Sequence, residues 1–217
     1  SEQNQIWVGM AKETAHQLGT PISSLMAWGV YFKEKYVEEP YIKELDKDVK
    51  RLEIITQRFS SIGSAPKMES LNIYEQVKSS VDYLKTRISK KVTINFTAQG
   101  AEYLSINMNP ELFSWVLENL IKNAVDAMAG VGQIHITMSC LVVGKLTIDI
   151  EDQGNGIAPN KISKVFKPGF STKNRGWGLG LTLSKRIIED YHGGRIFIKN
   201  STLNKGTSFR IILNTNA

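Results

Sequence analysis

The feature that most constrains the fold is the spacing of apolar and small residues in the first 62 positions. Two series of such residues recur every three or four positions, one over residues 18–36 and one over residues 42–62. This spacing keeps each series on one face of an α-helix, which repeats about every 3.6 residues. The first series is Leu18, Ile22, Leu25, Gly29, Phe32 and Tyr36, and the second is Ile42, Leu45, Val49, Leu52, Ile55, Phe59 and Ile62. We therefore expect two long amphipathic helices.

The short link between the two series predicts a helical hairpin. Pro40 follows Glu39 in this link and is suited to the first turn of the second helix. A hairpin with one apolar face per helix buries that surface poorly by itself. We therefore expect a second copy of the chain to complete a dimeric four-helix bundle.

Pro21 interrupts the first predicted helix and leaves two alternatives. A proline has no N–H for the helical hydrogen bond, and Gly19 and Thr20 beside it are poor helix formers, which is typical of a break between two helices. The apolar face keeps its phase on both sides of Pro21, which favours one long, bent helix. His16 lies on the other side of this helix, so we expect it to face solvent, with Thr20 one turn away on the same face.

The chain changes character near Gly63 to Pro66, where Gly, Ser and Pro cluster. We expect a first domain over residues 1–65 and a second over residues 66–217. In the second domain the patterns predict helices over residues 74–87, 110–128 and 179–191, and strands over residues 92–97, 103–108, 133–139, 145–151, 195–200 and 207–213. This mixture without a regular βαβ repeat predicts an α+β sandwich with helices on one face of a mixed sheet.

Composition excludes several classes of protein. The net charge of +6 comes from scattered Lys and Arg residues paired with acids, which favours an ordinary solvated surface over nucleic-acid binding. Cys140 is the only cysteine, so no internal disulfide framework exists, which fits a reducing compartment. No apolar run approaches the roughly 20 residues that cross a bilayer. We expect a soluble cytoplasmic segment, which could belong to a longer membrane-bound protein.

Two asparagines suggest a magnesium site. Asn119 and Asn123 are one helical turn apart within WVLENLIKNAVDAM, so their amide oxygens can point into one cleft. Such oxygens are suitable ligands for Mg²⁺, which takes its other ligands from phosphates and water. The alternative, two polar amides on an exposed helix face, remains open at this point.

Two glycine clusters follow. Asp152, Gly154 and Gly156 come directly after an apolar strand, where glycines allow a flat ligand to approach the backbone and a carboxylate can accept a hydrogen bond from an exocyclic amine. Gly176, Gly178 and Gly180 precede a predicted helix, and their N–H groups could bind phosphate oxygens. A dinucleotide-binding fingerprint is the rival interpretation, but its βαβ context and downstream acid are missing.

Charged and aromatic residues accompany the second glycine cluster. Lys173 and Arg175 stand directly before Gly176. Phe166, Phe170 and Trp177 lie between the two glycine clusters, in a stretch that we expect to form a mobile lid. We expect His135 and His192 to be structural residues of a strand and a helix end.

The order of these motifs resembles the catalytic core of a sensor histidine kinase of two-component signalling, over essentially the whole chain. HQLGTP is similar to the phosphoacceptor box, NLIKN to the asparagine box, and DQGNG and GWGLGL to the two glycine boxes. The resemblance implies an ATP-binding fold shared with gyrase-type ATPases, the cofactors ATP and Mg²⁺, a homodimer and a response-regulator partner. It further implies that this chain autophosphorylates and passes the phosphoryl group to an aspartate of the regulator.

The resemblance also implies roles for individual residues. His16 would be the nucleophile, Asp152 would bind adenine, and Lys173 or Arg175 would steady the γ-phosphate. Asn119 and Asn123 would bind Mg²⁺ and phosphate. The remaining nucleotide-binding positions would be Gly154, Gly156, Gly176, Gly178, Gly180 and Thr207.

Four positions bear on the reaction type. The hydrolytic relatives carry a glutamate base where this chain has Asn119, which favours phosphoryl transfer to protein over ATP hydrolysis. Gln17 stands where family members usually have an acid, and an amide can orient the imidazole but cannot act as a base. Asp126 stands where relatives often place a basic or other residue. Thr20 matches the residue that positions water in members that dephosphorylate their regulators. The alternatives are therefore a regulator phosphatase with weak kinase activity and a nucleotide-sensing scaffold without catalysis.

Overall fold

The computed structural model describes residues 2–36, 39–63, 66–170 and 179–215. The chain divides into two units, which comprise residues 1–66 and 67–217. Each unit has its own fold and is described separately below.

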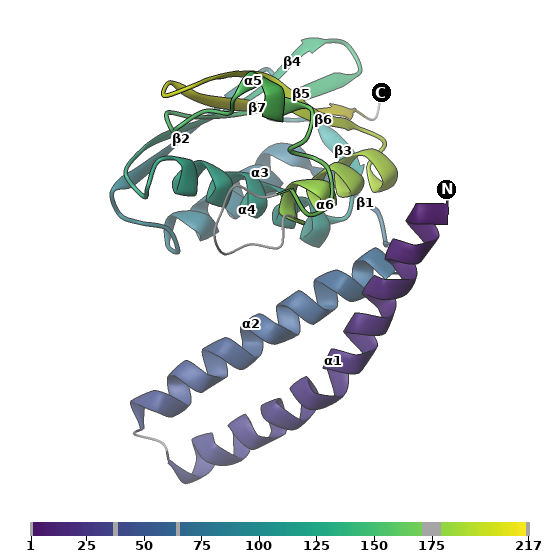
Figure 1. The fold of residues 1–217 in the computed structure, drawn as a ribbon, viewed down its shortest axis with the longest axis vertical. Coiled ribbons are helices and arrows are strands. Elements are labelled where there is room, and N and C mark those ends of the chain that lie inside the picture. The colour runs from purple at the N-terminus through teal and green to yellow at the C-terminus, as the bar shows by residue number, and fades with distance from the viewer. Residues whose placement is uncertain (1, 37–38, 64–65, 171–178, 216–217) are drawn as a thin grey trace. The chain divides into compact units, whose positions relative to one another are not determined.

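The first unit is a helical hairpin (Figure 1). Helix α1 spans Glu2–Lys35 and helix α2 spans Pro40–Gly63, with Pro40 as its first residue. Helix α1 continues through Pro21 and curves along its length, in agreement with the single-helix alternative (Figure 1). The hydroxyl of Ser23 donates to the carbonyl of Gly19 over 2.8 Å, so a carbonyl next to the interruption has a side-chain donor.

One face of the hairpin is buried and the flank beside it is not. Ala15, Ile22 and Gly29 recur every seven residues along the buried face of α1, and Lys33 joins Asp46 of α2 in an ion pair of 2.7 Å. The large apolar side chains that stay exposed include Leu18, Leu25, Trp28, Leu45, Leu52 and Ile55. The exposed fraction of Trp28 is 55%. The single hairpin therefore leaves apolar surface on both helices in water.

The second unit is built on a five-stranded mixed sheet. Its strands, in spatial order, are β2 (Val92–Gln99), β4 (Gly132–Val142), β5 (Lys145–Asp152), β7 (Gly206–Asn214) and β6 (Arg195–Thr202). The β2–β4 pair is parallel and the other pairs are antiparallel. A separate two-stranded antiparallel sheet joins β1 (Glu69–Asn72) to β3 (Ser105–Met108).

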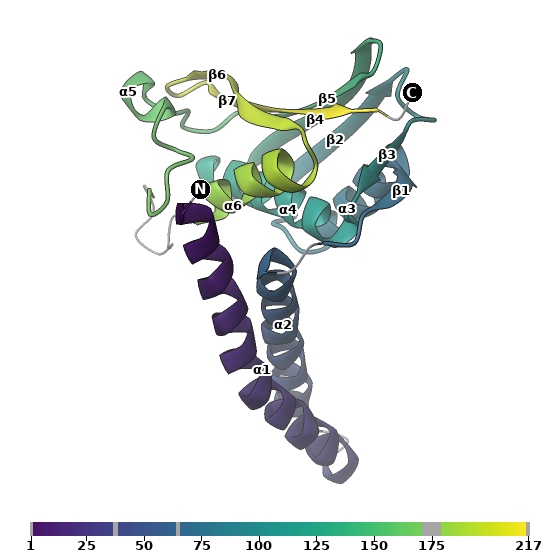
Figure 2. The same ribbon diagram turned by 90° about the vertical axis from the view of Figure 1, so that its right-hand side faces the viewer.

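Three helices cover one face of the large sheet (Figure 2). They are α3 (Ile73–Lys85), α4 (Pro110–Ala127) and α6 (Gly180–Arg186), the last continued by a π-helical turn, η1 (Ile187–Tyr191). Alternate strand residues such as Ile148 and Ile211 meet Leu117 and Ile121 of α4 in one fully buried core. The prediction of an α+β domain with helices on one face of a mixed sheet is confirmed.

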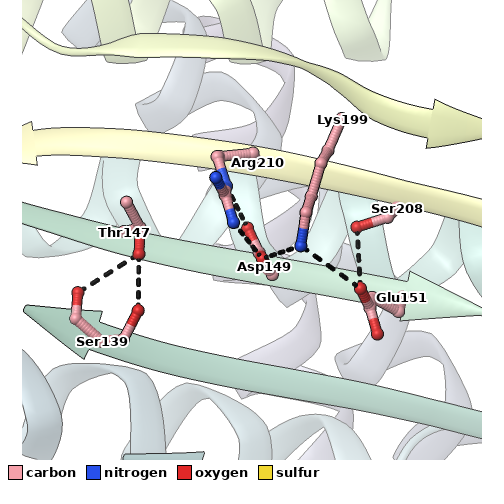
Figure 3. A network of polar contacts seen from close by, with 7 residues as sticks. All are labelled: Ser139, Thr147, Asp149, Glu151, Lys199, Ser208 and Arg210. Atoms are coloured by element: carbon pink, nitrogen blue, oxygen red, sulfur yellow. Dashed lines mark hydrogen bonds and ion pairs between the residues drawn. The ribbon is translucent and has the colours of Figure 1, made fainter. Parts of the chain in front are cut away.

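The opposite face of the sheet carries a polar network (Figure 3). Asp149 of β5 is buried and accepts two hydrogen bonds from Arg210, of 2.7 and 2.6 Å, and one of 2.9 Å from Lys199. Burial by itself would raise the pKa of Asp149, but the bonds and charges of Arg210 and Lys199 outweigh it and hold that pKa below its ordinary value. Ser208 donates to Glu151 over 3.1 Å on the same face. The network therefore joins the three strands β5, β6 and β7.

The structure corrects several predicted boundaries. The strand predicted over residues 103–108 begins at Ser105, because Tyr103 belongs to a turn. The helix predicted over residues 179–191 changes from α to π hydrogen bonding at Ile187. Strand β1 and the short helix α5 (Pro159–Ile162) were not predicted.

Candidate functional site

A buried carboxylate lies at the end of β5. Asp152 is the last residue of this strand and is only 9% exposed. The backbone N–H groups of Gly154 and Thr207 donate to its Oδ1 over 2.8 and 3.3 Å. Burial raises the pKa of Asp152 above its ordinary value of 3.8, against the opposing effect of these two hydrogen bonds. Both bonds end on Oδ1, and within the described ranges no hydrogen bond to Oδ2 is seen, so a donor group of a ligand could bind there.

The glycines around Asp152 are required by close backbone packing. A side-chain carbon at Gly154 would lie 2.6 Å from backbone atoms of Ala127, the last residue of α4. A side-chain carbon at Gly206 would lie 1.9 Å from the carbonyl oxygen of Asp152, and Gly206 has a φ of +113°. Gly156 has a φ of +67°, and a side-chain carbon there would lie 2.1 Å from the carbonyl oxygen of Thr202. The loop after β5 therefore packs tightly between α4 and the β6–β7 hairpin.

Hydrogen bonds fix the same loop to its neighbours. The N–H of Asn155 donates to the carbonyl of Ala127 over 3.0 Å, and the N–H of Asn204 donates to the carbonyl of Asn155 over 2.8 Å. The hydroxyl groups of Thr207 and Ser201 are 2.8 Å apart. Residues separated by about 50 positions in the chain are thus held around one carboxylate.

The two predicted magnesium ligands lie on α4. Asn119 is half-buried, and its Nδ2 donates to the carbonyl of Gly180 and to the hydroxyl of Ser184, both over 3.4 Å. Asn123 is half-buried one turn later, and Asp126 is exposed. Gly180 is the first residue of α6, so α4, which carries both asparagines, contacts α6 at its start.

Part of the predicted phosphate-binding segment lies outside the described residues. This applies to Lys173, Arg175, Gly176, Trp177 and Gly178.

Phe166, predicted to belong to a mobile lid, is anchored in the domain. Its ring meets that of Phe209 edge to face at 6.3 Å. Its carbonyl accepts a hydrogen bond of 3.1 Å from Thr182. These contacts pack Phe166 against the domain, and the mobile lid stays a prediction.

The residues of the predicted phosphoacceptor box lie on α1 in the first unit. His16, Gln17 and Thr20 are all exposed, and the exposure of His16 agrees with the prediction that it faces solvent. An exposed imidazole is accessible to a second protein.

Of the other two histidines, His192 has the structural character that was predicted, whereas for His135 this stays a prediction. His135 lies exposed on β4. His192 is buried, with Nε2 accepting from the N–H of Asn109 over 3.1 Å and Nδ1 lying 2.8 Å from the carbonyl of Ile187. Burial lowers the pKa of His192, so this ring is neutral at pH 7.

Ser184, a neighbour of Asn119, was not singled out from the sequence. It is fully buried and contacts Asn119, which precedes it by 65 positions. Its spacing of four from Gly180 is a weak signal, because a serine one turn after a glycine is common in helices.

The residues present fit a magnesium nucleotide. Asn119 and Asn123 offer amide oxygens, which are hard ligands of the kind that Mg²⁺ accepts alongside phosphates and water. Asp152 offers a free carboxylate oxygen in a buried setting, where a hydrogen bond to an exocyclic amine is shielded from water. Asp152 therefore suits the adenine end of ATP, and Asn119 and Asn123 suit its magnesium–phosphate end.

The fold and these motifs define a known class of protein. Residues 108–217, just over half of the chain, match the family described as histidine kinase-, DNA gyrase B- and HSP90-like ATPase, so the chain belongs to this family. Within it, the sequence is similar to sensor histidine kinase ZraS of Salmonella typhimurium, with 31% identity over 94% of this chain and 45% of the relative. The predicted resemblance to a histidine-kinase catalytic core is confirmed.

Solved structures of histidine kinases are similar to this chain as well. The catalytic domain of histidine kinase ThkA matches 68% of this chain and 95% of its own length, with 30% identity and a TM-score of 0.60. Histidine kinase ThkA in complex with response regulator protein TrrA matches 99% of this chain and 64% of its own, with 24% identity and a TM-score of 0.63, a likeness of fold. The chain spans about half the length of the curated relatives it matches. None of the helices in the described ranges is long and apolar enough to cross a membrane.

Proposed function

We propose that this chain is the core of an ATP-dependent protein-histidine kinase that phosphorylates itself on His16. The phosphoryl group then passes to an aspartate of a response regulator. The observation that carries the proposal is the buried Asp152, whose Oδ1 is held by two backbone N–H groups while Oδ2 remains for a ligand. Tightly packed glycines join the loop of Asp152 to α4, the helix that carries Asn119 and Asn123. The chain also belongs to a family of ATP-using proteins. The same chain presents an exposed histidine on a helical hairpin.

Asp152 would bind the adenine end of ATP. Its Oδ2 would accept a hydrogen bond from the exocyclic amine, while Gly154 and Thr207 hold its Oδ1. Gly156 and Gly206 keep the backbone of the neighbouring segments close to this carboxylate, because neither has room for a side chain. Adenine recognition therefore depends on backbone geometry as much as on one carboxylate.

Asn119 and Asn123 would hold the phosphate end through Mg²⁺. Bound magnesium would neutralise charge on the phosphates during transfer. Gly176, Gly178 and Gly180 would supply backbone N–H groups to the phosphates, and Lys173 or Arg175 would steady the γ-phosphate. Asn119 cannot deprotonate water, so this helix orients phosphates without promoting hydrolysis.

His16 would be the nucleophile. A neutral imidazole nitrogen attacks the γ-phosphorus, a nitrogen–phosphorus bond forms, and the bond from phosphorus to the bridging oxygen of ADP breaks. The proton of the imidazole leaves to solvent, because Gln17 beside it cannot act as a base. Exposure of His16 fits both its phosphorylation and the later transfer to a regulator.

We propose a homodimer formed by the hairpins, with residues 1–65 as the dimerisation and phosphoacceptor domain and residues 66–217 as the ATP-binding domain. The exposed apolar flank of α1 and α2, which includes Trp28 and Leu52, supports this dimer, since a second hairpin would remove it from water. The similar kinase whose structure includes a response regulator supports a partner of that kind.

A regulator phosphatase is a second candidate because Thr20 is exposed one helical turn after His16. Its hydroxyl could position water for attack on a regulator's phosphoaspartate. In that case a phosphorylated regulator would lose its label faster with the wild type than with Thr20→Ala. Equal rates with both proteins would remove this candidate.

Incubation with γ-labelled ATP and Mg²⁺ tests the kinase. We expect label on the protein that is lost in acid, as phosphohistidine is, and that is absent from His16→Gln. Glu34→Gln on the same helix is a suitable control, because it changes an exposed charged residue of α1 and leaves His16 in place. ATP binding without any label would rule out the kinase and leave the nucleotide-sensing scaffold, with the phosphatase judged by the Thr20→Ala comparison.

A further inference from the structure

Ser184 is a buried polar residue to which the proposed function gives no role. It lies on α6, one turn after Gly180, and is 0% exposed. Its hydroxyl donates to the carbonyl of Gly180 over 2.9 Å and also accepts from Nδ2 of Asn119 over 3.4 Å. A buried hydroxyl is costly to leave unpaired, and here both its donor and its acceptor capacity are used.

These contacts determine how Asn119 is oriented. Its Nδ2 is directed at two acceptors on α6, the carbonyl of Gly180 and the hydroxyl of Ser184. The nitrogen and oxygen of a side-chain amide lie on opposite sides of Cγ. Holding Nδ2 against Ser184 and Gly180 therefore fixes the position of Oδ1, which lies beside the start of α6, 3.7 Å from the place that a side-chain carbon at Gly180 would occupy.

We propose that Ser184 is a positioning residue that keeps Oδ1 of Asn119 directed at the magnesium–phosphate end of ATP. This inference rests on the proposed role of Asn119 in nucleotide binding. Without the hydroxyl, the Asn119 amide has one acceptor instead of two. It then rotates more freely, and its nitrogen can take the place of its oxygen. A donor in that place cannot ligate a cation.

The test compares ATP affinity with and without magnesium in the full chain. Ser184→Ala should weaken binding of ATP about three- to tenfold in Mg²⁺, the effect of losing one hydrogen bond, and change it less than about twofold in EDTA. Isothermal titration calorimetry gives both dissociation constants without depending on kinase activity. Ser184→Cys, which has the same shape with a somewhat larger atom and is a weak acceptor, should show a loss in the same direction and serves if the alanine variant is unstable.

Ser80→Ala is the matched control. Ser80 is also buried, at 7% exposed, and its hydroxyl donates to the carbonyl four residues earlier, that of Gln76, over 2.9 Å. It too bridges to α4, through Ser114 at 2.9 Å, but does not contact Asn119. This control should bind magnesium ATP like the wild type.

A double-mutant comparison decides the mechanism. If Ser184 acts through Asn119, the variant with both Asn119→Ala and Ser184→Ala binds magnesium ATP no more weakly than Asn119→Ala alone. Additive losses, or equal losses with and without Mg²⁺, would overturn the inference. Wild-type binding by Asn119→Ala would overturn it as well. The kinase proposal is judged separately, by ATP binding of Asp152→Asn and by labelling of His16→Gln.

Discussion

The backbone N–H of Thr207 donates to Oδ1 of Asp152 over 3.3 Å, although the two residues are 55 positions apart. The N–H of Gly154 donates to the same oxygen from the loop that follows Asp152 directly. One carboxylate oxygen is thus held by two segments of the fold, and the proposed function assigns the other oxygen to the ligand. The adenine end of the proposed site is preformed by the protein.

Asp152→Asn should change both stability and ATP binding. The raised pKa means that the folded protein binds this proton more tightly than the unfolded chain does. The resulting stabilisation is present below the unfolded pKa and is lost as pH rises through the folded pKa. The free energy of unfolding of the wild type should therefore fall relative to that of Asp152→Asn as pH rises from about 4 to 8, as measured by urea titration.

The amide of this variant can still accept from Gly154 and Thr207, so the fold should persist. Its Nδ2 would take the place of Oδ2 and present a donor to the adenine amine, so ATP should bind at least about tenfold more weakly. If the free energies of unfolding of the wild type and Asp152→Asn changed with pH in the same way, this would contradict the raised pKa of Asp152.

Gly154→Ala should destabilise the second unit by about 1–3 kcal/mol, because its Cβ would collide with the backbone of Ala127. Gly180→Ala is the matched control, since its Cβ would make only an ordinary contact of 3.7 Å with Asn119. Thermal unfolding followed by circular dichroism would separate the two. Equal melting temperatures would show that α4 and the loop after β5 separate easily.

Arg210→Ala should lower the free energy of unfolding by about 1–3 kcal/mol, because it removes two of the hydrogen bonds that hold the buried Asp149. Lys199→Ala removes one bond and leaves both of those from Arg210, so its loss should be smaller. Denaturant titration measures both values. The reverse order would show that Lys199, and not Arg210, keeps Asp149 ionised.

Gln17→Glu should raise the rate of autophosphorylation by about tenfold or more, because a carboxylate beside His16 can accept the proton that an amide cannot. The residue lies on α1, in a different unit from Asp152 and Asn119, so ATP affinity should not change. Initial rates of labelling at saturating ATP test the first expectation and calorimetry the second. A parallel change in rate and affinity would count against a role for Gln17 in proton transfer.

The sequence patterns were sufficient for the long elements and for the order of the motifs. Helix α4 has a strong apolar period and the Asn109–Pro110 start, and the apolar strands of the large sheet alternate. Strand β1, with the sequence Glu-Ser-Leu-Asn, has neither alternation nor β-branched residues, and it exists because it pairs with β3. Local patterns cannot reveal a pairing of that kind.

The same limit applies inside the candidate site. Asp152 and Asn119 were identifiable from their motifs, but their partners Thr207 N–H and Ser184 come from distant segments. Phe166 was assigned to a lid because its surroundings are irregular in sequence. Its contacts with Phe209 and Thr182 arise only from the tertiary fold.

The start of the second unit has a mechanical consequence. The carbonyl of Lys67 accepts a hydrogen bond of 2.9 Å from the side chain of Asn109, which also caps α4 by accepting from Leu112. Strand β1 follows and is paired with β3 in four successive register positions. A pulling force on Lys67 would therefore act on the β1–β3 hydrogen bonds and on the bond from Asn109 together. Because Asn109 caps α4, the force would act directly on the N-terminus of the helix that carries Asn119.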